Sequence, residues 1–172
     1  DIFKILGEEK DAFRIASNIV KERKFKLIKS VPDLVQIIKK SKKRDFKKKI
    51  NISTQTFQAI RIFVNKEISE LINGLINASK LLKKGGKIIV ITFHSLEDKI
   101  VKFFFSNYSA NKSRGSRYYP DNNQKKILFE NYKNKVIKPS LAEIEENNPS
   151  RSAKLRFATR NKDNFFYPSD LK

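Results

Sequence analysis

Apolar side chains recur at helical spacing in three stretches of the first half of the chain, residues 7–24, 30–40 and 54–82. Apolar positions three and four apart, with charged residues opposite, predict amphipathic helices. The second stretch begins Ser-Val-Pro-Asp, in which the serine can cap the helix, the proline suits its first turn and the aspartate completes a capping box. The third stretch is predicted to end at Gly85-Gly86, and Gly74 is the expected break if it forms two helices.

The pattern changes after the double glycine. Residues 87–93 are β-branched and almost continuously apolar, which is typical of a strand buried on both faces of a parallel sheet. Residues 153–158 alternate apolar with mainly basic side chains, which predicts a second strand with a basic outer face. Between the strands, Ser95 is the expected start of a helix that extends to about Phe105, and Ser140 has capping-box spacing for one short helix.

Together these elements predict an α/β protein. A helix, a double glycine and a buried strand form an αβ unit, whereas residues 1–52 are predicted to be entirely helical. Residues 53–172 supply helix, strand, helix and strand, so we expect an α/β domain that lacks most of its sheet. The chain contains no Met and begins with Asp1, and we therefore expect a fragment of a longer protein.

The charge balance points to a polyanionic partner. Lys and Arg number 38 against 18 acidic residues, a formal net charge of +20 at pH 7. A field of this sign attracts nucleic acid. Runs such as Lys47-Lys48-Lys49 and Lys83-Lys84 are equally consistent with a solvated face in a composition rich in Lys, Asn and Ile. Charge alone therefore leaves both interpretations open.

Several classes of protein are excluded by what the sequence lacks. Without Cys and with one His, neither a disulfide framework nor a metal site of the zinc type is expected. No apolar run approaches the roughly 20 residues of a membrane span, and no signal-peptide pattern opens the chain. We therefore predict a cytoplasmic protein without a membrane partner. The five glycines form no GxG turn, and neither a phosphate-binding P-loop nor a nucleophile triad is present.

The segment Phe93-His94-Ser95-Leu96-Glu97-Asp98 follows directly on the apolar strand. Side chains at the C-terminal ends of strands in open α/β sheets face the usual ligand crevice. There His94 could hydrogen-bond a base, and Asp98 could accept a proton or an amine hydrogen bond. The alternative is structural, because Ser95 and Asp98 have the spacing of a capping box beside which His94 would pack. The spacing favours the capping role for Ser95 and Asp98 and leaves His94 open.

Three other stretches carry candidate nucleic-acid contacts. Gln58, Arg61 and Asn65 share one helical face, which suits phosphates or base edges as well as an ordinary polar surface. Residues 148–156 place three basic side chains at a strand start, for phosphate contact or for protection of an edge strand. Residues 114–119, with two tyrosines and two arginines, could clamp single-stranded RNA or be a plain loop.

Taken together, these stretches resemble the bacterial 16S rRNA cytosine-N4 methyltransferases, the RsmH or MraW family. The strings FHSLED and TFQAIRI are too specific for both to match by chance, and all the matching strings occur in the family's order over nearly the whole chain. They are Gly7-Glu8-Glu9 with Arg14-Ile15-Ala16 and Ile19-Val20, Thr56-Phe57-Gln58-Ala59-Ile60-Arg61-Ile62 with Val64-Asn65 and Glu67, Gly85-Gly86 leading to Phe93-His94-Ser95-Leu96-Glu97-Asp98, and Asn148-Pro149 with Arg151-Ser152-Ala153-Lys154-Leu155-Arg156.

The resemblance implies the C-terminal part of a class I, Rossmann-like methyltransferase that uses S-adenosylmethionine. Residues 1–52 would be part of the family's inserted helical domain, and residues 53–172 the C-terminal half of its Rossmann-like domain. The family transfers a methyl group from S-adenosylmethionine to the exocyclic N4 of a cytidine in the decoding region of small-subunit ribosomal RNA. The small ribosomal subunit is therefore the expected partner.

The sequence departs from the family pattern in two ways. The family usually has His-Pro-Ala-Thr-Arg before Thr-Phe-Gln, whereas this chain has Asn51-Ile52-Ser53-Thr54-Gln55, so a guanidinium contact there is weakened or lost. The family's glycine-rich cofactor loop and acidic ribose-binding residues lie N-terminal to everything in this sequence. No cofactor-binding residue can therefore be assigned here, and the fragment alone is expected to be inactive.

The resemblance and the spacings together assign the candidate site. His94 and Asp98 are the expected catalytic residues, which position the cytosine for methyl transfer. The expected RNA contacts are Arg61, Asn65, Ser95, Arg151 and Arg156. The alternative from another class is a non-catalytic basic protein that binds RNA or the ribosome. That alternative explains the charge but neither the αβ unit nor the ordered strings.

Overall fold

The computed structural model describes four stretches of the chain, residues 1–42, 51–109, 126–130 and 132–168. Two of the segments singled out in the sequence lie outside these described residues. They are the basic run Lys47-Lys48-Lys49 and the 114–119 segment, expected as a solvated face and as an RNA clamp respectively.

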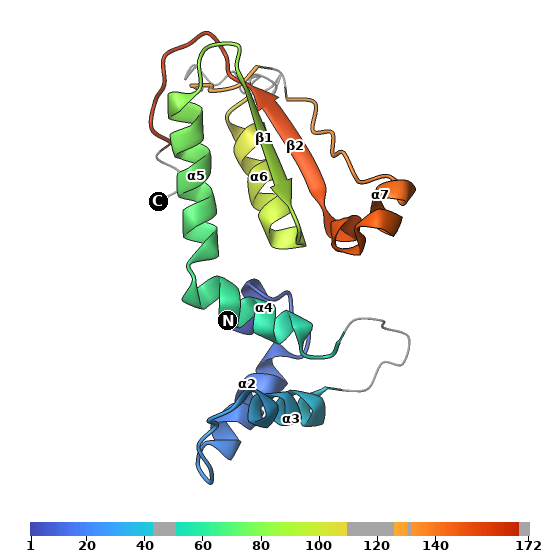
Figure 1. Cartoon of the computed structure of the whole chain (residues 1–172). Helices are drawn as coiled ribbons and strands as arrows, with labels where there is room; N and C mark the ends of the chain where they lie inside the picture. The colour runs from blue at the N-terminus through green and yellow to red at the C-terminus, as the bar shows by residue number, and fades with distance from the viewer. Residues whose placement is uncertain (43–50, 110–125, 131, 169–172) are drawn as a thin grey trace, which may run out of the picture. The chain divides into compact units, whose positions relative to one another are not determined.

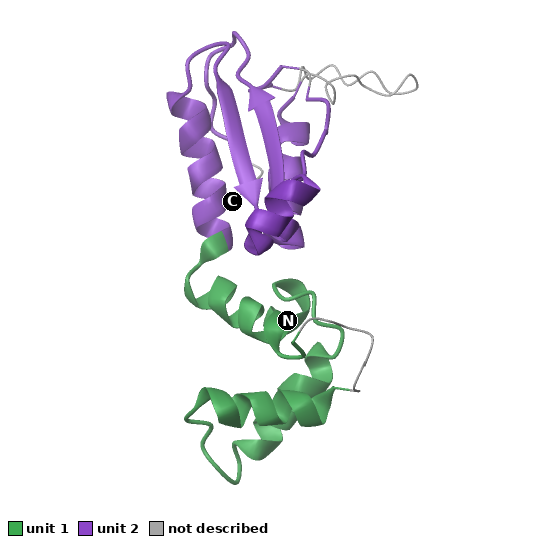
Figure 2. Cartoon of the chain, turned by 45° about the vertical axis from the view of Figure 1, so that its right-hand side comes forward, with its two compact units in different colours: residues 1–67 green, residues 68–172 purple. Residues whose placement is uncertain are grey.

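Two compact units make up the chain, Asp1–Glu67 and Ile68–Lys172 (Figure 2). Helix α4 (Thr54–Val64) belongs to the first unit, because it packs against α1 (Ile2–Ile5). The boundary between two compact units need not coincide with the boundary between two domains of a protein family. The domain boundary expected between residues 52 and 53 therefore stays a prediction.

The first unit is helical, as predicted (Figure 1). Besides α1 and α4 it contains α2 (Ala12–Glu22) and α3 (Val31–Ser41), which pack against each other. The capping box at the start of α3 is confirmed. The Ser30 hydroxyl accepts a hydrogen bond from the Asp33 backbone N–H at 3.3 Å, and the Asp33 carboxylate accepts one from the Ser30 N–H at 3.2 Å.

The helix predicted over residues 7–24 begins later than expected, because residues 7–9 form a turn rather than the first turn of α2. Glu8 has a φ of 49°, in the left-handed region that ends regular helix. Gly7 lies so close to α4 that an added Cβ would stand 2.5 Å from the backbone oxygen of Gln55. This close approach of two backbones explains why glycine is found here.

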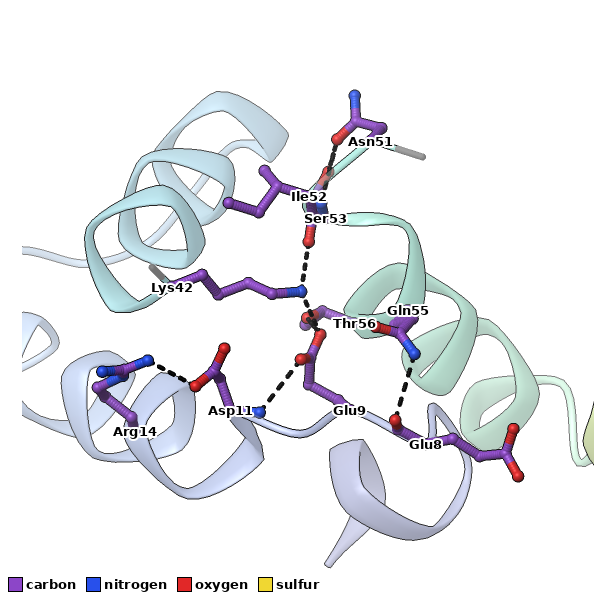
Figure 3. Close-up of polar contacts among 10 residues, drawn as sticks. All are labelled: Glu8, Glu9, Asp11, Arg14, Lys42, Asn51, Ile52, Ser53, Gln55 and Thr56. Atoms are coloured by element: carbon purple, nitrogen blue, oxygen red, sulfur yellow. Dashed lines mark hydrogen bonds and ion pairs between the residues drawn. The ribbon is translucent and has the colours of Figure 1, made fainter. Parts of the chain in front are cut away.

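A buried ion pair links three segments of the first unit (Figure 3). The Glu9 residue is 3% exposed, and its carboxylate accepts hydrogen bonds from Lys42 Nζ at 2.5 Å, the Asp11 N–H at 3.2 Å and the Thr56 hydroxyl at 3.4 Å. Lys42 Nζ also donates to the Ile52 carbonyl oxygen at 2.6 Å. The pair therefore joins the turn before α2, the end of α3 and the start of α4.

Residues 54–82 form two helices, but the expected break at Gly74 is wrong. The break lies at Lys66, whose φ of 53° separates α4 from α5 (Glu67–Leu81). Gly74 lies inside α5, where an added Cβ would have no atom within 4 Å. An exposed glycine weakens a helix by only about 1 kcal/mol relative to Ala, which does not end it. Neither α5 nor any other helix in the described stretches combines the length and apolar character of a membrane span.

The second unit contains the two predicted strands, β1 (Lys87–Thr92) and β2 (Lys154–Thr159). They pair antiparallel, with Lys87 opposite Thr159 and Thr92 opposite Lys154. The other elements are α5, α6 (Ser95–Asn107), α7 (Leu141–Glu146) and the 3-10 helix η2 (Asn148–Ser152). The described residues contain this one antiparallel sheet, so an α/β unit is confirmed, while the parallel Rossmann-like sheet stays a prediction.

The core of this unit lies between the sheet and helices α5 and α6 (Figure 1). Phe104 and Phe105 of α6 are 1% and 0% exposed, and each meets the buried Phe129 edge to face, with ring centroids 5.8 and 5.2 Å apart. Ile88 and Ala158 contribute the sheet's side of the core. Because both strands place residues of the same face in this core, one face of the sheet is covered.

The opposite face of the sheet is exposed, which corrects two expectations. Ile89 and Ile91 are 60% and 56% exposed, so the described residues cover β1 on one face and not on both. Phe157, opposite Ile89, is 41% exposed, whereas its neighbour Arg156 is 6% exposed. The basic face of β2 is therefore the inner face. Alternation defines two faces of a strand, and only packing selects which of them turns inward.

Replacing Lys42 by Met is expected to lower the free energy of unfolding of the first unit by about 3–5 kcal/mol, because the Glu9 carboxylate is left buried without its cation. Adding Glu9→Met should restore much of the loss, since neither charge is then unpaired. The measurement is urea denaturation followed by circular dichroism.

The matched control for this prediction is Arg14→Gln. It removes an ion pair with Asp11 whose two side chains are 44% and 32% exposed, for a loss below about 1 kcal/mol. Equal losses from Lys42→Met and Arg14→Gln would contradict the importance of the buried pair.

Candidate functional site

A pocket of about 300 Å³ opens where β1 ends and β2 begins. Because the strands are antiparallel, the residues that follow Thr92 and those that precede Lys154 meet at the same end of the sheet. A bridge between Ile137 and Leu155 adds a third segment beside them. The lining residues are Phe93, His94, Ser95, Lys138, Arg151, Ser152, Ala153 and Lys154. Three of the sequence-predicted site residues, His94, Ser95 and Arg151, are therefore brought together.

His94, and not Ser95, is the N-cap of α6. Its backbone is extended, with φ −135° and ψ 164°, and its Nδ1 accepts a hydrogen bond from the Glu97 N–H at 3.4 Å. The Glu97 carboxylate accepts a bond from the Phe93 N–H at 3.0 Å. The capping box expected for Ser95 and Asp98 is therefore wrong, since the cap and its acidic partner each lie one position earlier in the chain.

This cap determines which nitrogen of His94 can face a ligand. A neutral imidazole whose Nδ1 accepts a hydrogen bond carries its proton on Nε2. Nε2 is buried and lies 3.2 Å from Glu97 Oε1, but at an angle that gives it no hydrogen bond within the described part of the chain. A buried donor of this kind favours a partner with a hydrogen-bond acceptor.

Asp98 forms ion pairs with two cations of the second unit, Arg156 and Lys154. Its carboxylate accepts hydrogen bonds from Arg156 Nε at 2.6 Å and Nη2 at 3.1 Å, and from Lys154 Nζ at 3.2 Å. Arg156 Nη1 in turn donates to Tyr132 Oη at 3.0 Å and Asn134 Oδ1 at 3.1 Å. The network joins α6, the start of β2 and the 132–134 segment.

The electrostatics of this network are those of a paired, ionised carboxylate. The hydrogen bond from Arg156 lowers the pKa of Asp98 below its ordinary value, against the opposing effect of burial. The hydrogen bond to Asp98 likewise raises the pKa of the Arg156 guanidinium. Both groups are therefore charged at neutral pH. The sequence analysis expected Arg156 to contact RNA, whereas in the structure its guanidinium is buried against Asp98.

Arg61 and Asn65 belong to the first unit, whereas the residues that line the pocket belong to the second. Arg61 donates to both oxygens of the Glu67 carboxylate, at 2.7 and 3.1 Å, and Asn65 Nδ2 donates to the same carboxylate at 3.4 Å. The Arg61 side chain stays 57% exposed. The pair is thus oriented by Glu67 and accessible, and its contact with RNA stays a prediction.

Sequence reasoning missed the pocket residue Lys138. Lys138 stands in a polar stretch without periodicity, where no local pattern distinguishes it from the many other lysines. Its place in the pocket depends on two backbone hydrogen bonds of 2.9 Å between Ile137 and Leu155. Only the pairing of these distant segments reveals it.

Comparison with known proteins gives the class of this molecule. A family model described as the MraW methylase family matches residues 1–161. The ribosomal RNA small subunit methyltransferases H of Agrobacterium fabrum and Rhizobium johnstonii are each 46% identical to the chain over 159 residues, which is 92% of the chain and 46% of the relative. The protein of the same name from Rhizobium meliloti is 43% identical over the same share.

The chain thus has an α/β unit with a pocket at the strand end, and one family model matches most of its length. The chain belongs to the MraW methylase family. The resemblance expressed in the FHSLED and TFQAIRI strings is thereby confirmed. The chain spans about half the length of the curated relatives that it matches.

Asp98→Asn is expected to lower the free energy of unfolding of the second unit at pH 7 by about 3–5 kcal/mol, because it leaves the buried Arg156 without its counter-charge. The pKa of Asp98 is lowered on folding, so the ionised carboxylate stabilises the fold above its ordinary pKa of 3.8. This contribution is lost as the pH falls through the folded-state pKa. The difference between wild type and variant should therefore shrink in acid.

The matched control is Glu145→Gln on α7, an exposed carboxylate whose loss should change stability by less than about 0.5 kcal/mol at either pH. Chemical denaturation at pH 7 and pH 3 measures both variants. A difference for Asp98→Asn that does not depend on pH would show that the charge pair is not its cause.

Proposed function

We propose that this chain is part of a methyltransferase that transfers a methyl group from S-adenosylmethionine to the N4 amine of a cytidine in small-subunit ribosomal RNA. The observation that carries the proposal is the position of His94 in a basic pocket at the end of β1, in a chain of the MraW methylase family. The curated relatives are named for methylation of that RNA. The proposed partner is the small ribosomal subunit, and the proposed compartment is the cytoplasm.

The proposal for the fold follows the same family. Residues 53–172 are the C-terminal half of a Rossmann-like class I domain, and residues 1–52 are part of a helical insert. The exposed apolar face of β1, at Ile89 and Ile91, is what half of such a domain would present.

The described residues do not fit a cradle for S-adenosylmethionine. Gly7 packs on the backbone of Gln55, and Gly86 packs on Leu82. None of the described glycines lines the pocket, so none offers the close backbone approach that such a cofactor needs. The roles proposed for this chain's residues are therefore the binding and orientation of the RNA.

His94 is the proposed base-positioning residue. Its Nε2–H is a donor, and the cytosine ring offers acceptors at N3 and O2 beside the N4 amine that is methylated. One hydrogen bond from a rigid N-cap would orient the base, and orientation supplies a large share of catalysis when a weak nucleophile attacks a bound methyl donor. Ser95 and Arg151 line the same pocket and are proposed to contact the substrate.

Asp98 and Arg156 are proposed as positioning residues, which act through the pocket walls and not on the RNA. Arg156 is 6% exposed and Asp98 is 8% exposed. Their bonds to each other hold the first turn of α6, which begins at Ser95, against the start of β2. Arg61 and Asn65 on α4 are proposed as separate RNA contacts.

The test of the proposed function is methylation of small ribosomal subunits that lack the modification, by the complete gene product with His94→Asn. Asparagine is a good N-cap, so α6 keeps its start while the imidazole is lost. We expect kcat/KM to fall about 100-fold, which is typical when a substrate is poorly oriented.

Two readouts accompany this test. Thermal unfolding should show that His94→Asn changes stability by less than about 1 kcal/mol, since the cap is preserved. Unchanged turnover would remove His94 from the site. A wild-type protein that binds this RNA without methylating it would favour the non-catalytic RNA-binding alternative.

A further inference from the structure

Three cationic side chains line the pocket at the end of β1. They are Lys138, Arg151 and Lys154, and the lining includes no carboxylate. In the described part of the chain, Lys138 and Arg151 form no ion pair, while Lys154 shares the Asp98 carboxylate with Arg156. The pocket therefore carries at least two uncompensated charges in a concave surface, where a field is concentrated.

The backbone beside two of these cations, Lys138 and Arg151, is held by hydrogen bonds. Lys138 follows Ile137, whose backbone N–H and carbonyl both bond Leu155 at 2.9 Å. Arg151 lies on η2, which is anchored by the buried Ser150, 5% exposed. The Ser150 N–H donates to the Asn147 carbonyl at 2.9 Å. The backbone on which each cation lies is thus held by hydrogen bonds, and these bonds place both side chains at the pocket.

The other lining groups suit a nucleotide. Ser95 and Ser152 add hydroxyl groups, which can donate to an anion. Phe93 lines the same pocket and is 56% exposed, which leaves a ring face free to stack on a base. Several donors in one pocket match the oxygens of a phosphate better than the two of a carboxylate.

We propose that Lys138 and Arg151 form a phosphate subsite that takes a phosphodiester of the RNA strand next to the target nucleotide. Lys154 is the third cation of the subsite, partly neutralised by Asp98. The subsite rests on the proposed function, because the nucleotide beside it is the one that His94 orients. It assigns to Lys138 a role that no local sequence pattern indicates.

The test is binding of a fluorescent single-stranded RNA oligonucleotide by the complete gene product, without a methyl donor, over a series of salt concentrations. Each phosphate contact on single-stranded nucleic acid contributes about 0.7 to the slope of log affinity against log salt. Lys138→Gln and Arg151→Gln should each lower the affinity several-fold and reduce the slope by about that amount.

The matched control is Lys84→Gln, at the opposite end of β1 and equally a loss of one charge. It should leave the slope within error of wild type. Equal effects of all three substitutions would overturn the subsite, because the charge would then act only through the overall field. Competition by inorganic phosphate, with RNA binding unchanged in the two pocket variants, would also overturn it, since the subsite would then hold a free anion.

His94→Asn separates this proposal from the proposed function. It removes no cation, so its salt slope should equal that of wild type while its methylation falls. Loss of slope in Lys138→Gln with normal methylation by His94→Asn would support the phosphate subsite and reject the proposed role of His94. The reverse pattern would reject the subsite and keep the methyltransferase role.

Discussion

The second unit depends on one buried charge pair, Asp98 with Arg156. The two residues are 58 positions apart in the chain, and their contact holds the first turn of α6 on the start of β2. Two walls of the pocket meet near that point, since His94 and Ser95 lie at the start of α6 and Lys154 begins β2. A buried ion pair adds little net stability compared with apolar groups, but it leaves a costly unpaired charge if the elements are misaligned. The pair therefore acts mainly as a constraint on register and orientation.

The first unit uses the same device. Glu9 and Lys42 join three segments that local helix propensity cannot bring together, and Lys42 also satisfies the carbonyl of Ile52. The bond positions the start of α4, the helix that presents Arg61 and Asn65. In both units a buried carboxylate thus fixes the start of a helix that carries candidate site residues. Such pairs disfavour other arrangements of the elements, because a buried charge left without its partner is costly.

The inverted faces of β2 follow from this constraint. Leu155 and Phe157 have the hydrophobicity of an inward face, and a strand pattern by itself favours turning them toward the core. Arg156 is turned inward instead, because it has a carboxylate, a tyrosine hydroxyl and an amide oxygen to bind. A guanidinium satisfied by so many acceptors can be buried, whereas one without them would remain in water.

Much of this protein was readable from local pattern: the helices, both strands, the capping box at Ser30 and the strings that carry the family resemblance. These depend on neighbours within four residues or on alternation, and a linear sequence displays both. The N-cap role of His94, the break at Lys66 and the place of Lys138 in the pocket did not follow from the sequence. They depend on which side chain accepts the Glu97 N–H, on one left-handed residue and on a pairing between distant segments. The inward face of β2 and the place of Lys138 depend on groups remote in the chain, and tertiary structure alone decided these two features.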